Sequence, residues 1–363
     1  MKLTMNTSVL QGLVSRAMKG ASCDRLIPLT GLMAIELKDH TLTLTTTDAT
    51  NYLYVKEHKV DGDDFYVVVQ ADIFSKLISR LTCERVSMEL KEHSLTVTGN
   101  GKYLIELPLD EEGELIKYPN PVSNFVKGQA TNINLSTIKL ILSTAKPSLA
   151  PNADAALCYM GYFVGNKIIA TDTCQICGID IDMFDSPALI SSEMMTLLDV
   201  MTNEKIKAYR DADTMMFETD DCIVYGNTMD CLEDFQIDAI NELLGEEFDS
   251  ACRLPKNALL QLLDRLSLFV SNIDENGIYL TFTRDGLMIT SKQSNSSEVI
   301  SYVESNNFKD FTCCVDIEML RSLIKANTCD SIEMQYGEDN AIKLSDGNVT
   351  QILALLEDTR MSE

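Results

Sequence analysis

The chain of 363 residues lacks the features by which several protein classes are recognised. No apolar run approaches the ~18–20 residues that a membrane-spanning helix needs, and residues 1–15 hold no continuous apolar segment typical of a signal peptide. Glycine-rich phosphate-binding motifs and the HExxH metal motif are also absent. We therefore expect a cytoplasmic protein without membrane contact, cofactor or metal, and an enzyme is the least favoured class.

The cysteines and histidines do not show the spacing of a disulfide framework, a metal site or a catalytic pair. Eleven cysteines, an odd number scattered along a long chain, do not resemble a disulfide framework. Cys174 and Cys177 form a CxxC pair, but it lies in a strand-like run and no second pair stands at metal-ligand spacing. Two of the three histidines, His40 and His93, occupy the same position of a repeated hairpin. We interpret the thiols as packing residues and these histidines as turn residues.

Positive charge is scarce. The chain has 30 Lys and Arg against 55 Asp and Glu, which gives a net charge of −25 at pH 7. Taken alone, this excess argues against nucleic-acid binding, because phosphate contacts need cationic side chains. The argument depends on where the cations lie.

A hairpin pattern recurs along the chain. Residues 37–45 (LKDHTLTLT) return as residues 90–98 (LKEHSLTVT), and each copy reads as a strand, a two-residue polar turn and a second strand. Weaker copies lie at 162–170, 216–225, 279–290 and 332–344. An amphipathic segment with helical periodicity precedes each hairpin; these segments are residues 7–19, 72–81, 136–146, 192–201, 255–269 and 316–326. The sequence therefore predicts six helix-plus-hairpin repeats.

Six such units predict an α+β fold. One helix and one small sheet bury too little apolar area to be stable alone, so the units should pair. Pairing predicts three tandem domains of one type, each with two helices packed on antiparallel sheets, at residues 1–122, 130–246 and 250–363.

The cations are concentrated in the predicted helices. The six helices together carry a net charge of +4, which leaves about −29 for the strands and loops. Solubility and the helix dipole provide one explanation for this distribution. If the helices share one side of an assembly, however, that side could contact phosphates. The candidate DNA-facing cations on these helices are Arg16, Lys19, Lys76, Arg80, Lys139, Lys146, Arg265, Arg321 and Lys325.

Four segments resemble the bacterial replicative sliding clamp, the beta subunit of DNA polymerase III. They are residues 1–4 (MKLT), 27–32 (IPLTGL), 42–48 (LTLTTTD) and 170–172 (ATD). The resemblance implies a head-to-tail homodimer that closes into a ring, with helices inside and sheets outside. Such a ring encircles double-stranded DNA without reading its sequence. It is a non-catalytic accessory subunit that tethers the DNA polymerase, and its other partners are the clamp loader and proteins with clamp-binding motifs.

The resemblance also implies sites. It adds Arg25 to the DNA-facing residues and supports Arg80. It places a peptide-binding pocket at Thr171, Thr173, Cys174, Gln175, Ile176, Phe235, Ile237, Val315, Leu353, Leu355 and Leu356, although the basic character of the family's pocket signature is missing here. Pairing of edge strands between subunits would use Tyr103, Leu104, Ile105 and Leu107 on one side and Leu268, Phe269 and Ile273 on the other. An alternative interpretation, nearly as good, is that both sets are ordinary core residues.

Two functions remain open at this point. The first is a DNA-encircling processivity clamp. The second is an acidic protein-interaction scaffold with the same fold that no longer encircles DNA. The small net positive charge of the helices and the altered pocket are consistent with this second function.

Overall fold

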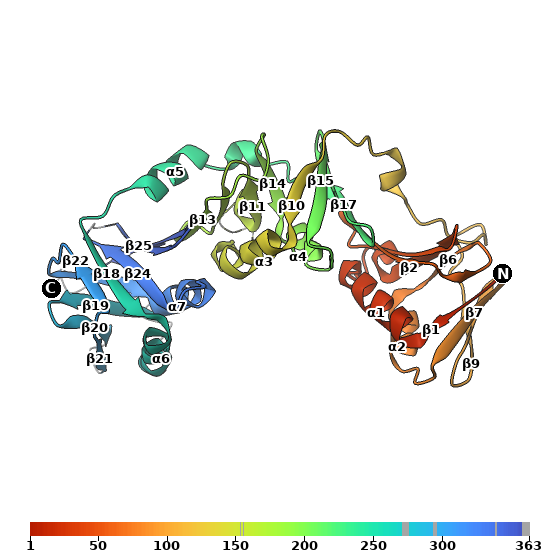
Figure 1. Cartoon of the computed structure of the whole chain (residues 1–363), viewed down its shortest axis with the longest axis horizontal. Coiled ribbons are helices and arrows are strands. Elements are labelled where there is room, and N and C mark those ends of the chain that lie inside the picture. The colour runs from red at the N-terminus through yellow and green to blue at the C-terminus, as the bar shows by residue number, and fades with distance from the viewer. Residues whose placement is uncertain (153, 155, 271–275, 293–295, 338–339, 358–363) are drawn as a thin grey trace. The chain divides into compact units, whose positions relative to one another are not determined.

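The structure is a computed structural model that describes residues 1–152, 154, 156–270, 276–292, 296–337 and 340–357 (Figure 1). It is an α+β fold, as predicted. Its helices are α1 (Thr7–Ala17), α2 (Ala71–Ser79), α3 (Leu135–Thr144), α4 (Ser192–Leu198), α5 (Ile237–Gly245), α6 (Lys256–Leu266) and α7 (Ile317–Ala326). Six of them confirm the six predicted helices to within a few residues, and α5 is a helix that was not predicted.

The chain forms two compact units. The first unit contains Met1–Lys139 and Glu193–Thr228, and the second contains Leu140–Ser192 and Met229–Glu363. Whether the chain also divides into the three predicted domains stays a prediction.

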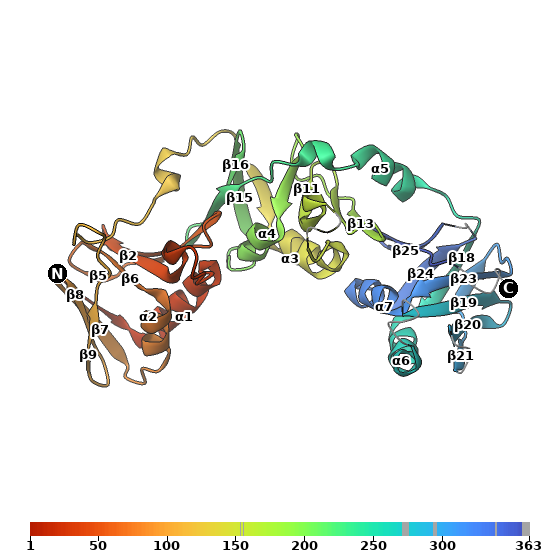
Figure 2. The ribbon, with the colours of Figure 1, turned by 180° about the vertical axis from the view of Figure 1, so that it is seen from behind.

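The first unit contains two antiparallel sheets. One has the order β5 (Asp61–Gly62), β1 (Lys2–Asn6), β7 (Arg85–Lys91), β8 (Ser94–Thr98), β9 (Lys102–Glu106). The other has the order β10 (Thr131–Asn134), β15 (Lys205–Asp211), β16 (Thr214–Glu218), β17 (Cys222–Asn227), β4 (Asn51–His58), β3 (Thr41–Thr47), β2 (Leu32–Lys38), β6 (Phe65–Gln70). Helices α1 and α2 pack against each other beside these strands (Figure 2).

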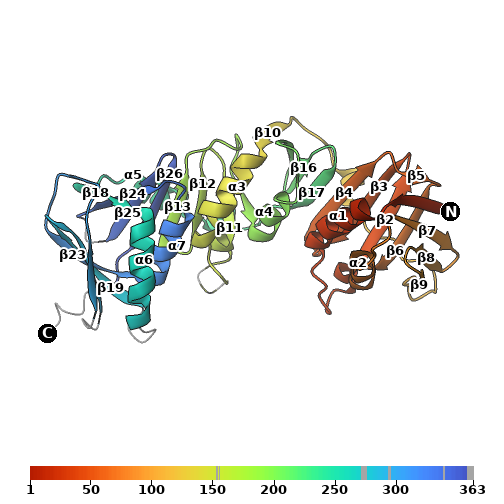
Figure 3. The ribbon, with the colours of Figure 1, turned by 60° about the horizontal axis from the view of Figure 1, so that its bottom comes forward.

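The second unit also contains two antiparallel sheets. The larger has the order β14 (Ala188–Ser191), β11 (Gly161–Val164), β12 (Ile168–Thr171), β13 (Gln175–Ile179), β26 (Val349–Ala354), β25 (Ala341–Asp346), β24 (Ser331–Tyr336), β18 (Ser250–Pro255), β22 (Glu304–Asn306). The smaller has the order β21 (Ser297–Ile300), β20 (Gly286–Ser291), β19 (Gly277–Thr283), β23 (Phe311–Asp316). Helices α6 and α7 lie side by side (Figure 3) and bury their apolar residues against both sheets.

The sheets are built from six half-sheets of four or five strands, one for each predicted repeat. Strands β4 and β17 join two half-sheets in the first unit, and we call this pairing the first seam. Strands β13 and β26 join two half-sheets in the second unit, and we call this pairing the second seam. The two remaining half-sheets end on β9 and β21, which pair on one side only among the described strands.

The predicted hairpin turns have the backbone that their residues favour. Asp39 and His40 both have positive φ angles, 47° and 60°, as the tight turn between β2 and β3 requires. Glu92 repeats this conformation between β7 and β8 with a φ of 37°. The turn expected at 338–339 lies outside the described residues. His40 is therefore a turn residue, as predicted.

Two chemical features can be stated for the described part of the chain. No helix there is long and apolar enough to cross a membrane. No group of three or more His, Cys, Asp or Glu residues there is placed to hold a metal ion. Cys177 is buried in β13, whereas Cys174 is exposed on the preceding turn.

Candidate nucleic-acid and peptide interfaces

The ten predicted DNA-facing cations differ in their partners. Four bind acids of the same chain: Arg16 binds Asp221, Lys76 binds Asp72, Arg265 binds Glu298, and Arg321 binds both Asp264 and Glu318. Five others are exposed and make no ion pair within the described residues: Lys19, Arg25, Arg80, Lys139 and Lys325. Lys146 is exposed on a short 3₁₀ helix after α3. The exposed cations lie at or near helices, where they could contact phosphates.

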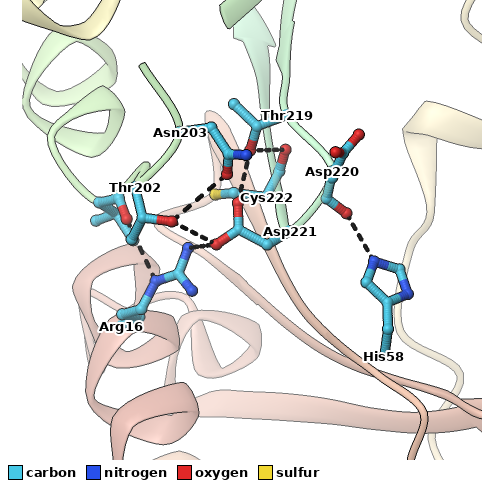
Figure 4. Close-up of polar contacts among 9 residues, drawn as sticks. Arg16, His58, Thr202, Asn203, Thr219, Asp220, Asp221 and Cys222 are labelled. Carbon is cyan, nitrogen blue, oxygen red and sulfur yellow. Dashed lines mark hydrogen bonds and ion pairs between the residues drawn. The ribbon is translucent and has the colours of Figure 1, made fainter. Parts of the chain in front are cut away.

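Arg16 reaches from α1 to the turn between β16 and β17 (Figure 4). Its Nη2 lies 2.8 Å from Oδ2 of Asp221, and its Nε donates a hydrogen bond of 3.3 Å to the carbonyl of Val200. The hydroxyls of Thr202 and Thr219 donate to the two carboxylate oxygens of Asp221, at 2.9 Å and 2.8 Å. The guanidinium of Arg16 is therefore held beside the first seam by groups of its own chain.

The Asp221 carboxylate is stabilised in its charged form. Burial alone would raise the pKa of Asp221, but the hydrogen bonds from Thr219 and Thr202 and the charge of Arg16 outweigh it. The pKa of Asp221 consequently lies below the ordinary value for aspartate. The preceding residue of the same turn, Asp220, contacts β4: its carbonyl oxygen lies 2.9 Å from Nε2 of His58, the last residue of β4 (Figure 4).

The predicted pocket residues 171–175 form a turn that also occurs in the first unit. Thr171 donates its hydroxyl to the carbonyl of Gln175 at 2.8 Å, and Asp172 accepts the backbone N–H of Gln175. Thr47 and Asp48 make the same two contacts to Asn51. Each turn contains one non-glycine residue with a φ near +80°, Thr173 in one copy and Ala49 in the other. The Thr-Asp pair therefore shapes the turn that leads into a seam strand.

An apolar cluster lies directly after this turn. Phe235 is buried and stacks on Phe163 with ring centroids 5.4 Å apart, while Tyr159 meets it edge-on at 5.5 Å. Ile176 is buried in the same cluster, and Ile237 at the start of α5 packs against it. The structure thus brings three of the predicted pocket residues together.

The C-terminal pocket residues belong to a neighbouring core. Val315 and Leu353 are buried in the core formed by α6 and α7, and Leu355 packs against that core. Leu356 donates its backbone N–H to the carbonyl of Cys314 at 2.8 Å, which holds Leu356 beside β23. Between the two groups, Ile352 of β26 faces Ile176 across the second seam.

The predicted subunit-contact residues also separate by exposure. Tyr103 and Leu104 of β9 are exposed, and so are Leu268 and Phe269 on a short 3₁₀ helix after α6. Ile105 and Leu107 are buried. Ile273 lies outside the described residues.

Sequence reasoning missed α5 and several residues of the apolar cluster. Ile240 and Leu244 of α5 are buried in the cluster, and Cys158 joins them. The spacing of Ile237, Ile240 and Leu244 was a helical signal that could have been used. The long-range contact of Arg16 with Asp221 left no comparable signal.

Comparison with known proteins identifies the fold. Residues 1–119 match the family model described as "DNA polymerase III beta subunit, N-terminal domain". No protein with curated annotation matches the chain in sequence.

Solved structures match the chain over nearly its whole length. The beta subunit from DNA polymerase of Streptococcus pyogenes is 15% identical with a TM-score of 0.83, covering 99% of this chain and 100% of that one. DNA polymerase III subunit beta from Borrelia burgdorferi is 14% identical with a TM-score of 0.85, covering 98% and 99%. The Thermotoga maritima beta subunit is 16% identical with a TM-score of 0.81, covering 99% and 100%. The resemblance is thus confirmed in sequence over the first third and in fold over nearly the whole chain.

Proposed function

We propose that this protein is a sliding clamp, a processivity factor that encircles duplex DNA as a head-to-tail homodimeric ring. The clamp-type fold and the family match of residues 1–119 support this proposal. In this proposal the chain has three clamp domains, at 1–122, 130–246 and 250–363, and acts in the cytoplasm. It performs no catalysis and tethers a DNA polymerase to its template.

The observation that carries the proposal is the pairing of the half-sheets. Two of the three possible junctions are closed within the chain, by β4 with β17 and by β13 with β26. The strands equivalent to these, β21 and β9, are the open edges of their sheets within the described residues. Open edges readily pair with another chain. Because the two edges are different surfaces, pairing one with the other joins the subunits head-to-tail. Head-to-tail pairing gives a closed ring if the rotation between neighbouring subunits brings the last subunit back to the first.

Weak attraction to DNA is consistent with this topology. The chain carries a net charge of −25, and four of the ten candidate cations already bind acids of the chain. Phosphate contacts from the remaining exposed cations would be few and independent of sequence. A closed ring keeps its DNA by enclosure, so it needs little affinity.

The second unit supplies a place for polymerase, clamp-loader and other clamp-binding peptides. The cluster around Phe235 and Ile176 lies beside the second seam, Leu355 packs on the neighbouring core, and Leu356 pairs with Cys314 of β23. Ile237, Leu355 and Leu356 are half-buried at the margins of these two cores, where they could receive the anchor side chains of a short peptide. We infer that a peptide-motif partner binds here.

A second candidate function is the acidic interaction scaffold without DNA encirclement. The internal ion pairs of Arg16, Lys76, Arg265 and Arg321 favour it, because they reduce the number of cations left for phosphate.

A threading experiment separates the two. Duplex DNA is anchored on beads at one end, the protein is added, and the free biotinylated end is blocked with streptavidin before a wash at high salt. A ring stays on blocked DNA, is lost from DNA with an open end, and is released when a restriction enzyme cuts the blocked DNA. Equal loss from blocked and open DNA would contradict encirclement and favour the scaffold.

A further inference from the structure

The larger sheet of the first unit has a face that turns away from α1. Thr46 of β3 donates its hydroxyl to the carbonyl of Ala17 in α1 at 2.6 Å, so Thr46 points toward that helix. Successive side chains of a strand point to opposite faces, so Thr43 points the other way. The strand pairing places Glu36 of β2 and Lys56 of β4 on either side of Thr43. These three residues form a row across the face that we call the outer face.

Part of the chain between β9 and β10 lies on this outer face (Figures 1 and 2). Residues 118–127, which we call the connecting segment, pack in two apolar clusters with residues of the sheet. The hydroxyl of Tyr54 on β4 donates to Oδ1 of Asn120 at 3.1 Å, and the hydroxyl of Tyr66 on β6 accepts the backbone N–H of Tyr118 at 2.9 Å. The connecting segment is therefore held at a fixed place on the sheet.

A cavity of about 240 Å³ lies between the connecting segment and the sheet. Thr45 and Tyr54 line it from the sheet, Val122 lines it from the connecting segment, and Glu36 and Lys56 line it from the charged row. Both charged side chains are half-buried, and neither makes an ion pair within the residues that the structure describes. Since a water molecule occupies about 30 Å³ in the liquid, the cavity has room for a group of several heavy atoms.

The second unit has the same row, but there the charges neutralise each other. Lys167 and Asp180 lie four residues before and nine residues after the first residue of the shared Thr-Asp turn, as Thr43 and Lys56 do. The Nζ of Lys167 lies 3.3 Å from Oδ1 of Asp180. Lys56 instead faces an uncharged threonine, and Glu36 lies one strand further on, so about 10 Å separates their backbones. The first unit therefore keeps two opposite charges that do not pair.

The second unit also fills the adjacent row with its own side chains. Phe163 occupies the position of Ala34, which lines the cavity of the first unit, and Phe235 stacks on Phe163. In the same row Leu244 of α5 packs directly on Gly178, where a Cβ atom would lie 2.8 Å from its Cδ1. The second unit thus closes with its own residues a place that the first unit leaves open.

The open charges match an extended peptide. Alternate side chains of an extended chain point to the same side, so the first, third and fifth residues of a peptide share one face and span about 13 Å. A basic residue and an acidic residue at the two ends of this span would reach Glu36 and Lys56. The middle residue would then enter the cavity as an apolar anchor, and the two charged contacts would select its neighbours.

We propose that the outer face of the first unit binds a short peptide segment of a partner protein. An apolar side chain of the peptide enters the cavity beneath the connecting segment, a basic side chain binds Glu36, and an acidic side chain binds Lys56. This site is separate from the peptide surface beside the second seam. It needs only the fold of the first unit, so it does not depend on the ring.

A synthetic peptide, acetyl-Lys-Ala-Leu-Ala-Glu-amide, tests the site in the full-length protein at physiological salt. Saturation-transfer NMR detects weak binding and should show the leucine methyl groups in contact with the wild-type protein. Glu36→Gln and Lys56→Gln should each weaken binding about 5-fold, as loss of one half-exposed charged contact does. Lys207→Gln, on β15 of the same sheet, and Glu57→Gln, which points to the opposite face of β4, are matched controls that should leave binding unchanged. Thermal melts establish that each variant is folded.

Two altered peptides test the anchor and the charges separately. Serine in place of the leucine removes the anchor, and glutamate in place of the lysine puts a like charge beside Glu36, so both peptides should bind at least ~5-fold more weakly. Failure of the first peptide to bind the wild-type protein would overturn the proposal, and so would equal affinities in Glu36→Gln, Lys56→Gln and the two controls. Peptide binding by a chain that sediments as a monomer would leave this site intact while overturning the ring.

Discussion

The guanidinium of Arg16 on α1 lies 2.8 Å from the carboxylate of Asp221, on the turn before β17. The pair connects residues that are far apart in the sequence, and both side chains are largely withdrawn from solvent. It lies beside the strand pairing of β4 with β17, so it ties a helix to the strand that continues the sheet. Arg16 therefore contributes to the first seam even though it is a helix cation.

Replacing Arg16 with alanine should destabilise the first unit by about 1–3 kcal/mol, because Asp221 would lose a charged partner and stay partly buried. Lys19→Ala, an exposed helix-end cation, is the matched control and should change stability by less than about 0.5 kcal/mol. Urea unfolding at neutral pH measures both. Equal small effects would show that the Arg16 ion pair contributes nothing to stability.

The same carboxylate predicts a pH dependence. The pKa of Asp221 is lowered in the folded chain, so its contribution to stability is complete above the unfolded pKa, about 4, and is lost as pH falls through the lower folded value. The stability difference between wild type and Asp221→Asn should therefore be largest near pH 7 and shrink between about pH 5 and pH 3. Urea unfolding at pH 7, 5 and 4 measures it. A difference that stays constant with pH would contradict the role of the charged carboxylate.

Local features of the fold were readable in the sequence. The hairpin at residues 37–45 predicted a turn at Asp39 and His40, and both have the positive φ that such a turn needs. The six amphipathic segments predicted α1, α2, α3, α4, α6 and α7, because helical periodicity over ten or more residues is a strong signal.

Contacts between distant segments were not readable. The pairing of β4 with β17 and the contact of Arg16 with Asp221 depend on how whole half-sheets meet, and one sequence carries no local pattern for that. Leu104 was predicted as a subunit-contact residue because it lies on a predicted edge strand. It is exposed in β9, which is consistent with such a contact. The contact itself stays a prediction. Helix α5 has the apolar spacing of a helix, but it lies between β17 and β18 and precedes no hairpin, so the repeat does not predict it.

The repeated Thr-Asp turn predicts two matching effects. Thr47→Val and Thr171→Val each remove a hydroxyl that donates to a buried carbonyl, at 2.6 Å and 2.8 Å, and that also accepts a backbone N–H. Each substitution should cost about 1–3 kcal/mol, because it removes the hydroxyl that both donates to the carbonyl and accepts the backbone N–H of the turn. Thr43→Val, in β3 but outside the turn, is the control. Urea unfolding of the three variants measures the costs, and a turn role is refuted if Thr43→Val costs as much as the other two.

The exposed cations predict a salt-dependent contact with DNA. Arg80→Gln and Lys139→Gln each remove one exposed charge that has no ion-pair partner among the described residues, and each should lower the slope of log affinity against log salt by about 1. The loss should be the same for DNA of any sequence, because phosphates carry no sequence information. Arg253→Gln removes the same charge from β18, where Arg253 binds Glu333, and is the control. Fluorescence anisotropy with a labelled duplex at several salt concentrations measures the slopes, and equal slopes in all three variants would show that the helix cations do not face the DNA.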